Sequence, residues 1–364
     1  MFEIDLLSKV VPYKLSSHKA WEASQGDVLK LDWNEATICP SPLVLKRLAE
    51  VVKSGRMNWY PDVDNKKLRQ KIADYCSVDV ENVQFFASSD SLHEYIVRCF
   101  VGFGDKTMIV SPTYDNFRAV AQANGADLIY HWLNSDFVLD YGRLRLDLVK
   151  FAPKIVYIVN PNNPTGSGHD VSVLERVILD FPKVLFIVDE AYYEFYGHTI
   201  SKLVSKTGNL IVTRTFSKAF ALASFRVGYV ISSPTIVDSL NKIRNAKNVS
   251  LFAQVAAEAV LDDLPYTENY VAEVIRAKDW FIEALQNLTF LETINSYGNF
   301  ILLKFKNRDE KLGLIVFLEN RGIYIRDYAH LVGMEVYARV TVGTLSEMQR
   351  VYKEFVDFSN SRFS

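Results

Sequence analysis

Few cysteines, no long apolar segment and almost no net charge set the first limits on this sequence of 364 residues. Cys39, Cys76 and Cys99 lie far apart, so they predict neither a disulfide framework nor a paired-cysteine metal site, and we expect no metal centre. Sparse thiols of this kind are typical of a reducing, cytoplasmic setting. The 41 lysines and arginines nearly balance 43 aspartates and glutamates, which leaves a net charge of −2. This balance offers no electrostatic attraction to nucleic acid or to an anionic membrane.

The hydrophobic content indicates a folded, globular protein. Hydrophobic residues make up 49% of the chain, which is too many for a disordered protein and enough for a large core. No window approaches the roughly 18 apolar residues that a membrane-spanning helix needs. Residues 1–11 carry Glu3 and Asp5 and have no long apolar stretch, so they do not predict a signal peptide. The sequence therefore predicts a soluble cytoplasmic protein of about two domains, without a nucleic-acid or membrane partner.

Short apolar runs alternate with helix-like segments through the first two thirds of the chain. The runs at 106–110, 154–159, 184–188 and 210–213 are apolar on both alternating faces, as in strands buried on both sides of a parallel sheet. The segment at 91–103 has apolar residues at helical spacing. This alternation predicts an open α/β sheet, and ligands bind such sheets at the carboxyl ends of the strands.

The pattern changes near residue 245. Long amphipathic helices are predicted at 254–261 and 270–288, followed by three separate strands and a final helix at 346–355. We expect three parts: an N-terminal arm over 1–30 that packs on the small domain or across a dimer, a large α/β domain over 31–245, and a smaller C-terminal α+β domain over 246–364.

Lys218 directly follows an apolar run, in the sequence Thr-Phe-Ser-Lys-Ala-Phe. An amine at the carboxyl edge of a sheet is suited to form an imine with a carbonyl cofactor. Apolar or cationic neighbours would lower its pKa and keep it nucleophilic. Ser217 and Arg226 could hold a phosphate, the arginine through charge-assisted hydrogen bonds. Taken alone, a lysine in this position is more often a surface residue in a loop.

Asp189 and Tyr192 follow the most apolar run of the chain. A carboxylate at the end of a buried strand needs a cation or a strong donor, and a protonated pyridine nitrogen would serve. Tyr192 comes three residues later and could reach a hydroxyl group of such a ring. The alternative for Asp189 is the N-cap of a helix, which is common after a strand.

Two loops and a tyrosine complete the candidate site. Asn163 belongs to the rigid turn 160–166, where an amide could donate to a phenolate-type oxygen, although such a turn can also be a plain connector. Ser89 and Asp90 precede a predicted helix, whose N-terminal N–H groups favour a phosphate, and the alternative is an ordinary capping sequence. Tyr114 follows another apolar run and could stack on a flat ring or simply pack.

Together and in this order, these motifs resemble the fold-type I pyridoxal-5′-phosphate (PLP) enzymes, and in particular the histidinol-phosphate aminotransferase family of class I/II aminotransferases. Three further segments resemble motifs of that family: 31–35 its LDxNE opening, 58–62 its NRYP segment and 339–344 its RxTVGT ending. The resemblance covers nearly the whole chain. It implies a large domain with a mainly parallel sheet flanked by helices, and a smaller C-terminal α+β domain.

The resemblance implies a role for each candidate residue at the cofactor. Lys218, Asp189 and Tyr192 would be the catalytic residues. Lys218 would bind PLP covalently and move the substrate proton, and Asp189 would pair with the pyridine nitrogen. Tyr192 and Asn163 would contact the 3′-oxygen, and Tyr114 would stack on the ring. The phosphate would be held by Ser89, the backbone of Asp90, Ser217 and Arg226.

The resemblance also implies a homodimer and a substrate site. Tyr60 would reach the cofactor phosphate of the neighbouring subunit, so that the two active sites are shared. Arg339 would bind a substrate carboxylate, whereas Arg326 and Tyr13 would bind a substrate phosphate. Asn34, in the LDxNE motif, is counted with these substrate-binding residues.

The implied activity is transfer of an amino group between L-glutamate or 2-oxoglutarate and a small phosphorylated amine or amino acid. Several positions depart from the family pattern: Ser91 replaces a glutamate, Ala221 and Ser224 replace glycines, and the family's NENP opening reads NEAT at 34–37. The added methyl and hydroxyl groups should narrow the space beside the cofactor phosphate. The resemblance therefore does not decide whether the substrate carries an imidazole ring. Two alternatives stand beside this prediction: a PLP-dependent decarboxylase of O-phosphorylated amino acids, and a binding module without turnover, against which the retained Lys218 argues.

Overall fold

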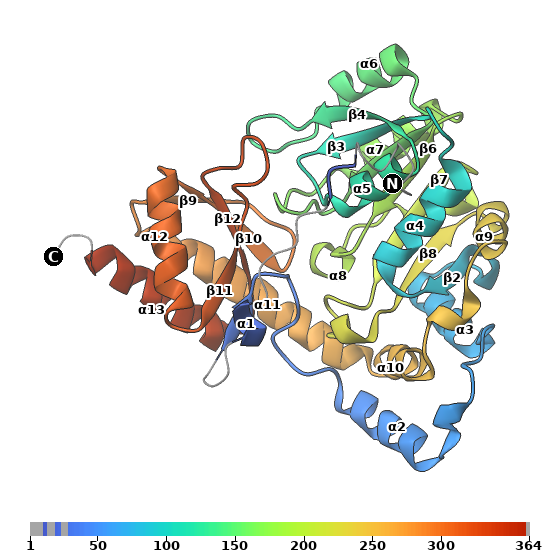
Figure 1. Ribbon diagram of the computed structural model, residues 1–364, viewed down its shortest axis with the longest axis horizontal. Coiled ribbons are helices and arrows are strands. Elements are labelled where there is room, and N and C mark those ends of the chain that lie inside the picture. The colour runs from blue at the N-terminus through green and yellow to red at the C-terminus, as the bar shows by residue number, and fades with distance from the viewer. Residues whose placement is uncertain (1–9, 13–18, 23–27, 362–364) are drawn as a thin grey trace, which may run out of the picture.

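The structure is a computed structural model and describes residues 10–12, 19–22 and 28–361 (Figure 1). Within these ranges the strands form two sheets, one of seven strands and one of five. The predicted α/β class is confirmed, because helices cover a mainly parallel sheet in the larger unit and pack on a mainly antiparallel sheet in the smaller one. None of the helices in the described ranges is long and apolar enough to cross a membrane.

The larger sheet has its strands in the order β2-β8-β7-β6-β5-β3-β4. Its neighbours pair in parallel except at β8, which runs antiparallel to both β2 and β7. The central strands are continuous apolar runs because both of their faces are buried. The strands are β2 (Val83–Phe86), β3 (Lys106–Ser111), β4 (Asp127–Trp132), β5 (Ile155–Val159), β6 (Leu185–Asp189), β7 (Leu210–Thr215) and β8 (Gly228–Ser232).

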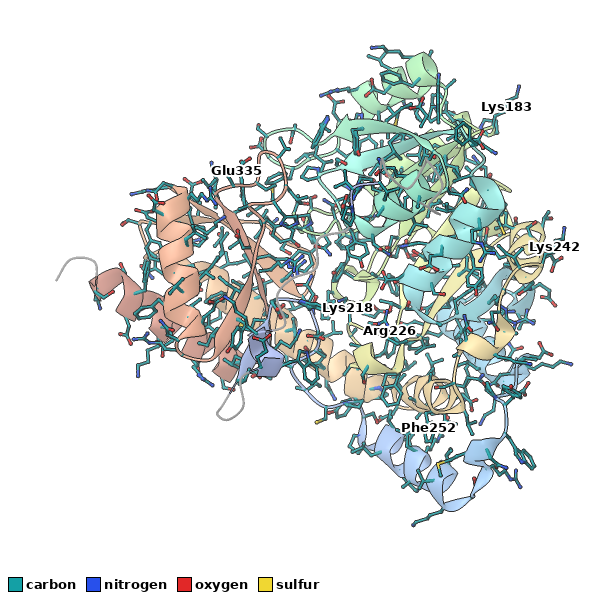
Figure 2. All side chains as sticks on the ribbon, in the orientation of Figure 1. Lys183, Lys218, Arg226, Lys242, Phe252 and Glu335 are labelled. Atoms are coloured by element: carbon teal, nitrogen blue, oxygen red, sulfur yellow. The ribbon has the colours of Figure 1, made fainter. Side chains whose placement is uncertain are left out.

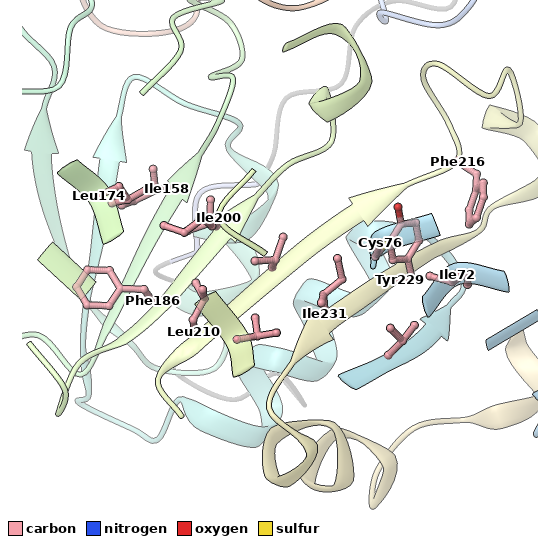
Figure 3. Packing of buried hydrophobic residues seen from close by; sticks show 14 of the residues in the cluster. Ile72, Cys76, Ile158, Leu174, Phe186, Ile200, Leu210, Phe216, Tyr229 and Ile231 are labelled. Atoms are coloured by element: carbon pink, nitrogen blue, oxygen red, sulfur yellow. The ribbon is translucent and has the colours of Figure 1, made fainter. Parts of the chain in front are cut away.

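Helices cover both faces of this sheet. Ile158 and Phe186 face one side and belong to one core cluster, in which Figure 3 shows Ile158 beside Leu174, whereas Tyr157 and Ile187 face a second core cluster on the other side. The helices of this unit are α2 (Pro42–Lys53), α3 (Lys66–Cys76), α4 (Ser88–Phe100), α5 (Asn116–Ala123), α6 (Tyr141–Phe151), α7 (Val171–Asp180), α8 (Tyr193–Tyr196), α9 (Pro234–Asn241) and α10 (Leu251–Leu261). Short 3-10 turns lie at η2 (Arg56–Asn58), η3 (Val80–Asn82), η4 (Ser201–Ser205), η5 (Ala223–Phe225) and η6 (Ala246–Asn248).

The smaller sheet has its strands in the order β1-β11-β12-β10-β9, and a single hydrophobic cluster packs it against α11, α12 and α13. The strands are β1 (Leu29–Leu31), β9 (Leu291–Ile294), β10 (Phe300–Phe305), β11 (Ile323–Asp327) and β12 (Tyr337–Thr341). The helices are α11 (Leu264–Leu285), α12 (Arg308–Glu319) and α13 (Leu345–Ser361). The one-turn helix α1 (Lys19–Glu22) is joined to this unit by an ion pair between Lys19 and Glu319.

This packing differs from the expected division of the chain near residue 245, whereas the end of the expected arm over 1–30 lies against the smaller unit. β1 pairs in parallel with β11, so residues 29–31 lie in the smaller sheet. α10 packs against α2 and α3, and its side chains Ala253, Ala256 and Val260 join the core of the larger unit. Because α10 is apolar on most of its faces, its sequence does not indicate which of the two cores it joins.

The fold gathers several loops at one edge of the larger sheet. β3, β5, β6 and β7 are parallel, so their carboxyl ends lie together, and polar segments follow each of them. The smaller unit contacts this edge, since Arg339 on β12 reaches Asn163 in the loop after β5. The predicted functional edge therefore lies where the two units meet.

Candidate active site

Lys218 lies in the loop after β7, between the two units, and Figure 2 shows it beside Arg226. Its Nζ donates to the backbone oxygen of Trp33 over 2.9 Å and lies 5.9 Å from the centre of the Tyr192 ring. Burial lowers the pKa of the Lys218 amine to about 8, and the positive charges of Arg339 and Arg226 act in the same direction. About a tenth of this amine is therefore unprotonated, and nucleophilic, at pH 7, far more than for a lysine of ordinary pKa.

Asp189 ends β6 with a side chain that is almost fully buried. Its Oδ1 accepts from the backbone N–H of Ala191, and its Oδ2 accepts from the hydroxyl of Tyr157 over 3.1 Å. Nε2 of His93 lies 3.4 Å from the same Oδ2. Burial raises the pKa of this carboxyl, while His93 and the hydroxyl donors pull it down. The site thus holds a buried carboxylate for which a cationic ring nitrogen is a suitable partner.

The hydroxyl of Tyr192 accepts hydrogen bonds from two amides. Nδ2 of Asn34 lies 2.9 Å away and Nδ2 of Asn163 lies 3.2 Å away. Burial raises the pKa of the Tyr192 hydroxyl above its ordinary value, so it remains protonated and can itself donate. The structure therefore brings together three of the residues that the sequence singled out, from three different segments of the chain.

Arg339 is buried on β12 and is held by oxygens of both units. Its Nη1 donates to Oδ1 of Asn163 over 2.6 Å and to the hydroxyl of Tyr328 over 2.7 Å, and its Nη2 donates to the backbone oxygen of Asp32. Its Nε is buried and has no hydrogen-bond partner among the described residues. Arg326 on β11 is the direct cross-strand neighbour of Arg339 and is also buried. Two guanidinium groups on one face of a sheet favour an anion between or beside them.

The N-terminus of α4 forms a second anion-binding element. Ala87 precedes the helix and provides no side-chain cap, and the N–H of Ser91 donates to Oγ of Ser88 over 3.2 Å, so the N–H groups of Ser89 and Asp90 are the ones suited to an external acceptor. Arg226 lies nearby, because its Nη2 is 3.1 Å from Oδ2 of Asp90. A Cβ atom on Gly228 would lie 2.7 Å from the backbone nitrogen of Ser89, so β8 and the first turn of α4 are in direct backbone contact.

Some predicted residues make other contacts than the sequence suggested. The hydroxyl of Tyr114 donates to Oδ1 of Asp90 over 2.9 Å, which ties the tyrosine to the loop that should hold a phosphate. Oγ of Ser217 accepts from the hydroxyl of Thr215 over 2.9 Å. Ala221 and Ser224, which replace family glycines, line a hollow beside the 28–37 segment.

Two predicted residues are not brought to the site within this chain. Tyr60 is 77% exposed and packs against Nζ of Lys247, 4.3 Å from its ring centre. Tyr13 lies outside the described residues. Cys39, Cys76 and Cys99 are free thiols, and among the described residues none of them is hydrogen-bonded to Lys218 or Asp189.

Sequence reasoning missed His93 and Tyr328, which contact the central residues. His93 stands on the apolar face of α4, where a single histidine gives no local signal of function. Tyr328 directly follows the strand that carries Arg326, and an aromatic residue in such a position is usually a packing residue. Only the three-dimensional structure reveals that these side chains reach Asp189 and Arg339.

The residues present fit the cofactor that the resemblance implies. An amine of lowered pKa, a buried carboxylate, a pair of amides around a tyrosine hydroxyl and a helix N-terminus with a nearby arginine lie in one region. These are the groups that a carbonyl carbon, a pyridinium nitrogen, a ring hydroxyl and a phosphate require.

Comparisons with known proteins agree with this fit. Residues 26–355 match the family described as aminotransferase class I and II. The chain is 42% identical to a dihydroxyacetone phosphate transaminase of Campylobacter jejuni, over 98% of this chain and 97% of that protein. It is 34% identical to a histidinol-phosphate aminotransferase of Caldanaerobacter subterraneus, over 86% and 88% of the two chains. The crystal structure of histidinol-phosphate aminotransferase from Sinorhizobium meliloti in complex with pyridoxal-5′-phosphate superposes with a TM-score of 0.90 at 23% identity, over 99% and 98% of the chains.

Proposed function

Because the chain belongs to the class I and II aminotransferases, which are PLP-dependent enzymes, we propose that it transfers the amino group of L-glutamate to dihydroxyacetone phosphate. The products would be 2-oxoglutarate and the monophosphate of 2-amino-1,3-propanediol, since the amino group replaces the ketone oxygen at carbon 2. The single observation that carries this choice of acceptor is the 42% identity to a dihydroxyacetone phosphate transaminase over 98% of the chain.

Within this proposal the cofactor is held by the residues at the edge of the larger sheet. Lys218 would bind it covalently, and Asp189 would pair with its pyridine nitrogen. Asn163 and Tyr192, which are hydrogen-bonded to each other, would contact its ring hydroxyl, and Tyr114 would stack on the ring. Its phosphate would be held by Ser89, the backbone of Asp90, Ser217 and Arg226, and the ion pair of Arg226 with Asp90 at the start of α4 supports this assignment. When bound, PLP supplies an electron-withdrawing ring that makes the proton at the amine-bearing carbon removable.

Lys218 has the properties required to move that proton. Its pKa of about 8 lies close to the working pH of a cytoplasmic enzyme, which favours both removal and return of a proton at Nζ. The backbone oxygen of Trp33 accepts a hydrogen bond from Nζ and so orients the amine. Burial of the surrounding side chains excludes water that would compete for the proton.

The two arginines divide the recognition of the substrates. Arg339 presents a buried Nε without a partner, so it can donate to the α-carboxylate of L-glutamate. Arg326, its cross-strand neighbour, is assigned to the phosphate of the acceptor. Asn34 and Tyr328 hold Tyr192 and Arg339 in place through hydrogen bonds of 2.9 and 2.7 Å. In this arrangement the acceptor is recognised through a phosphate at one end. None of the residues assigned to substrate binding is assigned to an imidazole ring.

The protein is also proposed to act in the cytoplasm as a homodimer with shared sites. α2 and the segment that follows it project away from both sheets (Figure 1). This region exposes six large apolar side chains: Leu45, Val52, Met57, Trp59, Tyr60 and Val63. An exposed apolar region of this kind favours contact with a second protein surface. A second copy would bury it and would bring Tyr60 to the other active site.

A half-reaction assay tests the proposed function. L-Glutamate is added to the purified holoenzyme while the absorbance of the lysine-bound cofactor is followed, and dihydroxyacetone phosphate is then added. The proposal predicts loss of the band, its return with the acceptor, and a phosphorylated amine that mass spectrometry detects. Faster return with the ketone of histidinol phosphate would contradict the choice of acceptor. Release of CO₂ from O-phosphoserine or O-phosphothreonine, with L-glutamate inert, would identify a decarboxylase instead.

A further inference from the structure

His93 occupies a buried position between the sheet and α5. It stands on α4 with 0% of its surface exposed. Its Nε2 lies 3.4 Å from Oδ2 of Asp189 and 3.5 Å from the hydroxyl oxygen of Thr213. The rings of Phe117 and Tyr157 meet its own ring edge-on, at centroid distances of 5.6 and 5.5 Å. These two aromatic rings therefore restrict the orientation of the imidazole from two sides.

The groups around Asp189 come from β5, β7, α4 and the turn that follows β6. Tyr157 on β5 donates to Oδ2, Thr213 on β7 is its register partner, and the backbone of Ala191 donates to Oδ1. Among the described residues that contact this carboxylate, His93 is the basic one. The negative charge of Asp90, which lies on the same helix as His93, raises the pKa of Asp189 and so opposes its ionisation.

The other ring nitrogen of His93 argues against a purely packing role. Nδ1 is buried and has no hydrogen-bond partner among the described residues. A leucine or phenylalanine at this position would fill the aromatic pocket without burying an unpaired polar atom. Its Nε2 provides the compensating contacts, with the hydroxyl of Thr213 and with Oδ2 of Asp189, and Asp189 is the charged partner of the two.

We propose that His93 is a positioning residue for Asp189: its Nε2–H donates to Oδ2 and holds the carboxylate oriented and ionised toward the pyridine nitrogen of PLP. The inference rests on the role of Asp189 in the proposed function but is independent of the substrate. Burial raises the pKa of Asp189, and His93 is the strongest of the influences that lower it. Loss of the imidazole would thus favour the neutral acid, which no longer stabilises a protonated ring nitrogen.

The test uses three variants of the full-length protein loaded with PLP labelled with ¹⁵N in the ring. His93→Leu removes the donor and fills the pocket. His93→Gln places an amide N–H near the position of Nε2 without a titrating ring. The matched control is His131→Leu, because His131 is equally buried, bonds to Asp147 over 2.8 Å and has an unpaired Nε2, but lies on β4. The readouts are the ring ¹⁵N chemical shift as a function of pH, the affinity for PLP and the melting temperature.

The inference predicts a ring nitrogen that is protonated at neutral pH in the native enzyme and in the His131→Leu variant. In His93→Leu it should lose its proton at a lower pH, with PLP affinity reduced about tenfold, and His93→Gln should restore most of both. A native-like titration and affinity in His93→Leu would overturn the inference about His93. If His93→Leu does not fold, His93→Phe, which also fills the pocket without a donor, takes its place, and a native-like titration and affinity there would overturn the inference equally. An unprotonated ring nitrogen in the native enzyme would instead overturn the assignment of Asp189.

Discussion

Arg326 and Arg339 lie directly opposite each other on the antiparallel strands β11 and β12, and both side chains are buried. Like charges in directly opposite positions destabilise a sheet unless an anion or carbonyl oxygens compensate them. Arg339 already has three oxygen acceptors, from Asp32, Asn163 and Tyr328. The two guanidinium groups can still donate hydrogen bonds to an anion. The proposed substrates, a dicarboxylic amino acid and a phosphorylated ketone, would supply that anion one after the other.

Replacement of either arginine should separate the two half-reactions. Arg339→Gln removes the proposed partner of the L-glutamate carboxylate, and a lost charge-assisted hydrogen bond costs about 1.5–3 kcal/mol, or roughly 10- to 150-fold in kcat/KM. Arg326→Gln should cause a loss of similar size for dihydroxyacetone phosphate. Stopped-flow measurement of each half-reaction gives the two values separately. Equal losses in both half-reactions for both variants would refute this division of roles.

Lys218→Ala should abolish the absorbance band of the lysine-bound cofactor. Without the proton carrier at Nζ, turnover should fall about 10²- to 10⁴-fold or more, since general acid–base catalysis contributes that amount. Lys183→Ala, at an exposed position between α7 and β6, serves as the control and should leave spectrum and turnover unchanged. An unchanged cofactor spectrum in Lys218→Ala would show that another residue carries PLP.

Attachment of PLP to the cofactor-free protein should depend on pH through Lys218. Only the neutral amine attacks the aldehyde, and the pKa of Lys218 is lowered to about 8 by burial. Below this pH the attachment rate should rise about tenfold per pH unit, and it should level off above pH 8. Rapid mixing at constant ionic strength measures the rate. A profile that still rises to pH 10, near the ordinary lysine value, would contradict the lowered pKa.

Gly228→Ala should weaken cofactor binding through the backbone. The added Cβ would meet the backbone nitrogen of Ser89 at 2.7 Å and the carbonyl oxygen of Arg214 at 2.8 Å, and neither can move without distorting the sheet or the first turn of α4. Overpacking of this kind costs about 1–3 kcal/mol of stability. Gly208→Ala is the control, because nothing lies within 4 Å of its added Cβ. Calorimetry and PLP titration of both variants would test this, and equal affinities would count against a phosphate site at Ser89.

Leu45→Glu combined with Trp59→Glu should convert a dimer into monomers. The two positions are 60% and 64% exposed in the single chain, so charge there has little effect on folding but opposes burial against a second copy. Leu146→Glu on α6, at a position that is 71% exposed, is the control. Analytical ultracentrifugation measures the association state, and an unchanged sedimentation coefficient in the double variant would exclude this region as the interface.

Much of the larger sheet and its chemistry could be predicted from local sequence. Its strands are continuous apolar runs because both faces are buried, and the polar motifs that follow them contain Lys218, Asp189 and Asn163. The core that α10 joins and the strand with which β1 pairs could not be predicted, for physical reasons. The apolar faces of α10 match either core, and the pairing of β1 with β11 joins residues about three hundred positions apart. No local pattern encodes such contacts.

The same limit applies to the site. Arg339 was singled out from its motif, but its hydrogen bonds to Asn163 and Tyr328 depend on how the smaller unit packs against the larger one. His93 carries no motif, and its contact with Asp189 arises because α4 crosses the face of β6 and β7. Local sequence identified groups with the right chemistry. Which of them meet was decided by tertiary packing.

The most direct test of the central claim is a competition between two acceptors in one reaction. Holoenzyme is converted to its amino form with L-glutamate, freed of excess donor, and mixed with equal amounts of dihydroxyacetone phosphate and the ketone that corresponds to histidinol phosphate. Mass spectrometry then quantifies the two amines formed in a single turnover. The account predicts that the amine of dihydroxyacetone phosphate exceeds the other about tenfold or more, since one selective contact is worth about 1–3 kcal/mol. An excess of histidinol phosphate, or no amine of dihydroxyacetone phosphate at all, would contradict it.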